Sequence, residues 1–112
     1  MSILFNTSED HRKIAEVLQA QWKLNLGLDV ELSNQEWGSY LRATTTLQYQ
    51  IARRSWIGDY ADPNTFLATL VSGDGNNRTG WSNAGYDSLI ALAARTLDRP
   101  ARAGYLQQAE AI

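Results

Sequence analysis

The sequence predicts an α/β fold with a βαβαβ core, and two observations carry this prediction. Short apolar or alternating segments at residues 3–5, 28–32 and 47–52 are typical of strands, whereas apolar residues between them recur every three or four positions, as in amphipathic helices. The joints between these segments are short, which favours right-handed βαβ units with parallel strands. Further helices are predicted in the C-terminal part of the chain.

The first predicted βαβ unit covers residues 3–32. Residues 3–5 are a continuous apolar run, as expected of a buried strand. Thr7 and Asp10 have the spacing of a capping box at the start of the following helix, and Gly27 is placed to end that helix in a left-handed conformation. The predicted apolar face of the helix consists of Ile14, Val17, Leu18, Gln21 and Trp22.

A second, shorter helix and a third strand complete the predicted core. Ser33 or Asn34 is a suitable N-cap for a helix that runs to about Leu41. Three consecutive threonines at residues 44–46 disfavour its continuation, because β-branched side chains lose rotamer freedom in a helix. Residues 47–52 then alternate, which places Leu47, Tyr49 and Ile51 on one face of a strand.

Cap signals mark three helices after the core. Asp62 can cap a helix that has Pro63 at its first position, Asn83 can cap another, and residues 98–100 open a third. Residues 72–80 are rich in Gly and Asn and predict the longest loop of the chain. The apolar face of the helix that Asn83 caps is predicted to hold Tyr86, Leu89, Ile90, Ala93 and Leu97.

The end of the sequence indicates that more chain follows. Residues 105–112 remain in helical rhythm, with neither a C-cap glycine nor a polar tail. We therefore expect residues 1–112 to form a single partial domain of a longer protein.

Composition and charge exclude several classes of function. The 112 residues include 10 basic and 12 acidic side chains, so the net charge of −2 supplies no broad positive field to attract nucleic acid. Because there is no cysteine and only one histidine, His11, we expect neither a metal site nor a cofactor. No apolar run approaches the roughly 20 residues that span a bilayer, so we expect no direct membrane insertion, and no signal peptide is visible.

Aromatic and charged side chains are concentrated in residues 53–64, directly after the third predicted strand. In open α/β sheets ligands bind beyond the carboxyl ends of the strands, so this location favours a ligand site. Asp59 can pair with a ligand ammonium group, and Arg53 can hold a ligand carboxylate with its forked guanidinium. Trp56, together with Trp37 from the second helix, can supply flat apolar walls for ligand side chains.

Each of these residues also has an ordinary structural interpretation. The tryptophans can be core residues, Asp59 can be a turn residue, and one of the adjacent Arg53 and Arg54 is expected to be solvated. Asp59 and Asp62 could in principle form a glycosidase pair, but two nearby carboxylates are too common to support that activity. We therefore expect no enzymatic function.

Three segments of the chain carry a family resemblance. The first segment is Phe5-Asn6-Thr7-Ser8 with residues 22–27 and 29–32, the second is Asn34-Gln35-Glu36-Trp37, and the third is Ile51-Ala52-Arg53 with Trp56, Gly58-Asp59-Tyr60 and Asp62-Pro63. In this order and spacing the segments resemble the second large lobe of the bacterial extracellular solute-binding proteins that serve oligopeptide and dipeptide ABC importers. The match is nearly continuous over residues 3–92, and it is more specific than any one motif.

The resemblance implies a truncated lobe of the periplasmic-binding-protein type II kind, with additional helices at its C-terminal end. Such a two-lobed protein closes on a peptide in the periplasm or at the extracellular face of the cell envelope and delivers it to ABC permease subunits. The signal peptide would lie outside this stretch of chain.

The resemblance also implies roles for four residues. Asp59 matches the position whose carboxylate binds the peptide α-amino group, and Arg53 matches an arginine available to the peptide carboxylate. Trp37 and Trp56 match tryptophans that line side-chain pockets.

The chain departs from the family pattern at two places, and alternatives to peptide binding stay open beside the resemblance. Residues 41–48 differ from the corresponding segment of close relatives, and Arg54-Ser55 replaces the small residue and glycine that often precede the tryptophan. One alternative is a non-peptide solute such as a nickel chelate, an opine or an oligosaccharide. Another is that the lobe is the ligand-sensing module of a regulator.

Overall fold

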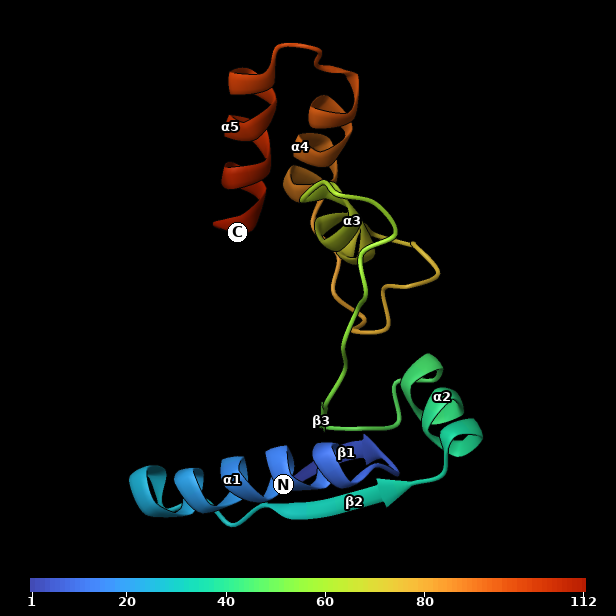
Figure 1. Ribbon diagram of the computed structural model, residues 1–112, viewed down its shortest axis with the longest axis vertical. Helices are drawn as coiled ribbons and strands as arrows, with labels where there is room; N and C mark the ends of the chain where they lie inside the picture. The colour runs from blue at the N-terminus through green and yellow to red at the C-terminus, as the bar shows by residue number, and fades with distance from the viewer. The chain divides into compact units, whose positions relative to one another are not determined.

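A small parallel sheet and a group of helices occupy different parts of the chain. The computed structural model describes residues 1–112, which divide into two compact units, Met1–Ser55 and Trp56–Ile112. The assignment of both units to one partial domain stays a prediction. The first unit contains β1 (Ser2–Asn6), α1 (Glu9–Leu26), β2 (Glu31–Gln35), α2 (Trp37–Thr45) and β3 (Ile51–Ala52). The second contains α3 (Asn64–Leu67), a 3-10 turn (Ala68–Leu70), α4 (Ala84–Arg95) and α5 (Arg99–Glu110). Figure 1 labels the α-helices and strands of both units.

The sheet of the first unit has the strand order β2-β1-β3, and both pairings are parallel. Ile3 of the central strand lies opposite Leu32 on one side and Ile51 on the other. The predicted βαβαβ core is therefore confirmed. Side chains on both faces of β1 are buried, which explains why its sequence is a continuous apolar run and does not alternate.

The two helices of the first unit pack on opposite faces of β1. Ile3 and Phe5 form a buried cluster with Ala15 of α1, whereas Leu4 forms a separate cluster with Tyr40 of α2. Successive side chains of a strand point to opposite faces of the sheet, so the three residues of this apolar run contribute to two separate buried clusters.

The start of α1 differs from the predicted capping box. Ser8 is the N-cap residue, and its side chain makes no capping hydrogen bond. The Thr7 hydroxyl instead donates to Asn34 Oδ1 at 2.9 Å and contacts the Gln35 carbonyl oxygen at 3.2 Å. The prediction was wrong because the parallel pairing brings the end of β2 beside Thr7, where it offers nearby acceptors.

The buried face of α1 is rotated relative to the predicted one. Ala15 is fully buried and Leu18 and Trp22 are half-buried, but Ile14 and Val17 are 44% and 55% exposed. The small Ala15 side chain lets the helix approach the sheet closely, so the contact centres on Ala15. The predicted helix end is confirmed, because Gly27 has φ 67° and its N–H bonds to the Lys23 carbonyl.

The second strand begins three residues later than predicted, because its register with β1 places Glu31 opposite Ser2. The predicted caps Ser33 and Asn34 therefore lie within β2. The α2 helix is capped by Glu36, whose carboxylate accepts hydrogen bonds from Gly38 N–H at 2.8 Å and Ser39 N–H at 3.3 Å.

The threonine run and the third strand also differ from prediction. The α2 helix continues to Thr45, and buried Thr44 bonds the Leu41 carbonyl through its hydroxyl, which satisfies that polar group inside the helix. Leu47 has φ 56°, which breaks the expected alternation. Only Ile51 and Ala52 pair as β3, so the third strand is shorter than residues 47–52.

In the second unit α4 and α5 lie side by side (Figure 1) and share a buried core. The predicted caps are confirmed, since Asn83 Oδ1 accepts from Gly85 and Tyr86 N–H, and Asp98 Oδ2 accepts from Ala101 N–H. Leu97 was wrongly placed on the apolar face, because it follows the end of α4 and is 98% exposed. The core consists of Tyr86, Ile90, Ala93, Leu106 and Ala109.

The predicted loop at residues 72–80 is confirmed and is organised by Asn77. Its amide nitrogen donates to the carbonyl oxygens of Leu70, Val71 and Trp81 at 3.0–3.1 Å. Its amide oxygen accepts from the backbone and the hydroxyl of Thr79. None of the helices is both long and apolar enough to cross a membrane.

Candidate ligand-binding site

Trp37, the first residue of α2, presents its ring at the surface of the first unit. Its side chain is 56% exposed, so it is not a core residue. The ring stacks on that of Tyr40, with centroids 5.6 Å apart and planes 20° from parallel. Because Tyr40 is buried, the stacking fixes one face of the indole on the body of the unit. Trp37 is thus a supported aromatic surface.

Arg53 follows β3 directly, and its backbone is held on both sides. Its N–H donates to the Leu4 carbonyl at 2.8 Å, which extends the parallel pairing by one residue. Its carbonyl accepts from the Tyr40 hydroxyl at 2.8 Å. The guanidinium bonds Ser55 Oγ at 3.2 Å and is half-buried. Tyr40 therefore connects two of the predicted site residues, Trp37 through its ring and Arg53 through its hydroxyl.

Asp59 and Trp56 belong to the second unit. Trp56 is half-buried, and Asp59 is exposed in the turn before α3. The backbone N–H of Asp59 donates to Thr65 Oγ1 at 3.0 Å, but its carboxylate makes no hydrogen bond or ion pair within the protein. An exposed carboxylate on an anchored backbone is available to a cationic group.

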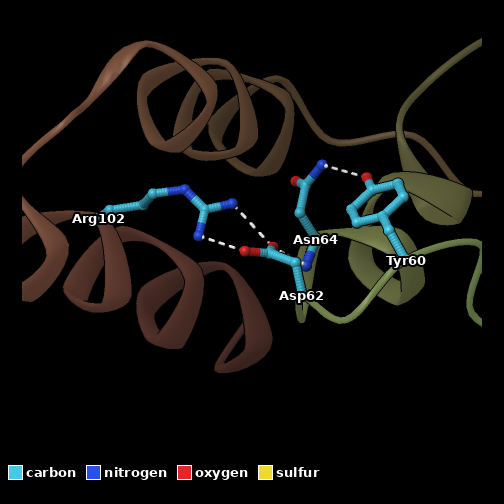
Figure 2. Close-up of polar contacts among 4 residues, drawn as sticks. All are labelled: Tyr60, Asp62, Asn64 and Arg102. Carbon is cyan, nitrogen blue, oxygen red and sulfur yellow. Dashed lines mark hydrogen bonds and ion pairs between the residues drawn. The ribbon is translucent and has the colours of Figure 1, made fainter.

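Asp62, only three residues further on, is fully engaged (Figure 2). One carboxylate oxygen, Oδ2, bonds Arg102 Nη1, and the other, Oδ1, bonds Arg102 Nη2, both at 2.7 Å. Oδ1 also accepts from Asn64 N–H at 2.8 Å. These hydrogen bonds, first those from Arg102 and then that from Asn64, hold the pKa of Asp62 below its usual value.

The predicted N-cap position is wrong by one residue, because α3 begins at Asn64 and Pro63 is its N-cap residue. The Asp62 carboxylate nevertheless accepts a hydrogen bond from the Asn64 N–H. Sequence reasoning missed the second role, its pair with Arg102. The two residues are 40 positions apart, and no local spacing signals their contact. The pair leaves Asp62 without a free carboxylate oxygen, in contrast to Asp59.

The neighbouring side chains close this turn with one more bond. Asn64 Nδ2 donates to the Tyr60 hydroxyl at 3.2 Å (Figure 2), although the ring of Tyr60 is more than half exposed. The turn between residues 59 and 64 is therefore held by polar contacts to α3 and α5. The ligand-binding roles of Trp37, Arg53, Trp56 and Asp59 stay predictions.

The chain is similar to proteins whose names refer to peptide binding. It is 44% identical over 94 residues to the periplasmic murein peptide-binding protein MppA of Escherichia coli K12, a match that covers 84% of this chain and 18% of the relative. The chain thus spans about a fifth of the length of such relatives.

Two solved structures have the same fold. The unliganded open form of the murein tripeptide-binding protein MppA matches with a TM-score of 0.95 and 41% identity, over 98% of this chain and 21% of that one. Haemophilus influenzae OppA in complex with the peptide RPPGFSPFR matches with a TM-score of 0.92 and 36% identity, over 97% of this chain and 22% of that one. The expected fold of a periplasmic-binding-protein type II lobe is thereby confirmed.

The family assignment rests on most of the chain. Residues 1–78 match the family described as bacterial extracellular solute-binding proteins, family 5 Middle. This range includes the whole sheet unit and the turn that carries Asp59 and Asp62. The chain belongs to the family 5 bacterial extracellular solute-binding proteins.

Proposed function

We propose that this chain is part of one lobe of a substrate-binding protein that captures peptides and delivers them to the permease of an ABC importer. The protein would act in the periplasm or at the extracellular face of the cell envelope. The relative with a bound peptide supports this proposal, because nearly all of this chain matches the fold of one part of it at 36% identity. No covalent bond is made or broken in this function.

The difference between Asp59 and Asp62 is the observation that carries the proposal. Asp62 is committed to Arg102 and to the start of α3, whereas the Asp59 carboxylate is exposed and has no partner within the protein. A peptide at neutral pH carries a protonated α-amino group, and a carboxylate binds it through charge-assisted hydrogen bonds. Asp59 is therefore the acidic residue of this turn that we assign to amine capture.

The other three residues would contact the rest of the peptide. Trp37 offers the exposed face of a ring that Tyr40 supports, and such a face accepts varied apolar side chains without requiring a fixed hydrogen bond. Trp56 is assigned the same kind of contact. The Arg53 guanidinium is assigned to a peptide carboxylate. Broad selectivity follows, because flat apolar walls and water tolerate different side chains.

Calorimetry on the complete protein that contains this chain tests the proposal, with tetra-alanine and N-acetyl-tetra-alanine as probes. We expect tetra-alanine to bind, and both Asp59→Asn and acetylation of the peptide to weaken binding. Asp10→Asn is a matched control, because Asp10 is an exposed aspartate in the first turn of α1.

Several outcomes would contradict the proposal. If Asp59→Asn and acetylation both leave the affinity unchanged, Asp59 does not capture the amine. If the protein ignores peptides but binds a nickel chelate, an opine or an oligosaccharide, the ligand class is wrong. We expect the 112-residue chain alone to bind tetra-alanine weakly or undetectably, so submicromolar affinity would contradict its assignment as part of a site.

A further inference from the structure

The side chain of Thr65 contacts the two consecutive residues Gly58 and Asp59. Thr65 is only 4% exposed, and its hydroxyl accepts the Asp59 N–H at 3.0 Å. Its methyl group, Cγ2, lies so close to Gly58 that a Cβ added there would be 3.0 Å away. Both branches of one buried side chain therefore hold the turn that carries the Asp59 carboxylate.

Thr65 is in turn held at the start of α3. Its backbone N–H bonds the Asp62 carbonyl at 3.2 Å, and the Asp62 carboxylate bonds both Arg102 of α5 and the Asn64 N–H. The position of Thr65 is thus set by two helices of the same unit. Since the Asp59 side chain makes no hydrogen bond or ion pair of its own, the polar contact that holds this residue is the backbone hydrogen bond that Thr65 accepts.

We infer that Thr65 is a positioning residue that holds Asp59 in place for a ligand ammonium group. This inference rests on the proposed function. A carboxylate on an unrestrained turn must be ordered when the ligand binds, and that ordering costs affinity. A buried hydroxyl that fixes the turn beforehand removes part of this cost and leaves the carboxylate itself exposed.

Two substitutions separate the hydroxyl from the rest of the side chain. Thr65→Val keeps the shape and removes the acceptor for Asp59 N–H, whereas Thr65→Ser keeps the acceptor and removes the methyl group. In the complete protein we expect Thr65→Val to weaken tetra-alanine binding by up to about tenfold, the range of one hydrogen bond. We expect Thr65→Ser to retain most of the affinity.

The acetylated peptide provides the readout that a general structural role would not give. It lacks the ammonium group, so Thr65→Val should leave its weaker binding unchanged. Wild-type affinity of Thr65→Val for tetra-alanine would overturn the inference, and so would an equal loss for both peptides. If Asp59→Asn has no effect on tetra-alanine binding, the proposed function fails instead.

Hydrogen exchange decides the positioning role independently of any ligand. In the peptide-free protein, the Asp59 amide should exchange faster in Thr65→Val than in Thr65→Ser, because only the serine variant retains the acceptor. Equal exchange of this amide in the two variants would overturn the inference. This measurement stays decisive even if tetra-alanine does not bind.

Discussion

Arg102 and Asp62 lie 40 residues apart and form two hydrogen bonds of 2.7 Å, one from each terminal guanidinium nitrogen to a different carboxylate oxygen. The contact joins α5 to the turn that precedes α3, within the second unit. Its side chains remain partly exposed, at 28% each. The forked geometry makes the pair directional, so a lysine in place of Arg102 would keep the charge but not both bonds.

We expect Asp62 and Arg102 to stabilise the second unit jointly. Asp62→Ala and Arg102→Ala should each lower the urea midpoint of unfolding. The double variant should lose less unfolding free energy than the sum of the two single losses, because either substitution alone already breaks the pair. Unfolding followed by tryptophan fluorescence measures all three. Arg102→Lys should have a urea midpoint between those of the wild type and Arg102→Ala. Strict additivity would show that the pair contributes no interaction energy.

The same pair predicts a pH dependence. Bonds from Arg102 and from Asn64 N–H hold the pKa of folded Asp62 below the unfolded value of about 3.9. A lowered folded pKa means that the stabilisation is present above the unfolded pKa and is lost as the pH falls through the folded pKa. The stability difference between wild type and Asp62→Asn should therefore be largest near neutral pH and shrink below about pH 4. A difference that is constant into the acid range would contradict this.

Tyr86→Phe tests a buried hydroxyl in the helical core. The Tyr86 hydroxyl donates to the Leu67 carbonyl at 2.5 Å, and burial raises the pKa of this side chain. The phenylalanine keeps the ring and its edge contact with Trp81, so the expected loss is that of one hydrogen bond, about 1 kcal/mol. Denaturant unfolding measures the loss. Tyr105→Phe is the control, because Tyr105 packs against the same core without such a bond. An equal loss of stability in Tyr105→Phe would show that the hydrogen bond of Tyr86 is not the cause of the loss.

Two isoleucines test the observed orientation of α1. Ile3 is buried in the central strand, so Ile3→Ala should cost about 2–5 kcal/mol of unfolding free energy. Ile14 is 44% exposed on α1, and Ile14→Ala should cost less than about 1 kcal/mol. Chemical denaturation of the two variants compares the sites. Similar costs would mean that the face containing Ile14 is buried as the sequence pattern predicted.

The candidate site rests on residue types and on the family resemblance. These suggest ligand-binding roles for Trp37, Arg53, Trp56 and Asp59, which stay predictions, but nothing in the sequence separates the free Asp59 carboxylate from the engaged Asp62 carboxylate. That difference depends on Arg102, which the packing of α5 against α3 places beside Asp62. The contact of Thr65 with the turn at Asp59 was missed for a similar reason, since no sequence motif distinguishes a threonine in the first turn of a helix.

The sequence by itself determined the βαβαβ order and the helix ends whose partners are a few residues away. Gly27, Asn83 and Asp98 were predicted correctly because a cap bonds backbone groups of its own helix within the first or last turn. The tertiary structure decided the strand register, the buried face of α1 and the Asp62–Arg102 pair. Each of these depends on contacts between groups far apart along the chain. Local sequence periodicity does not indicate which distant residues will be in contact.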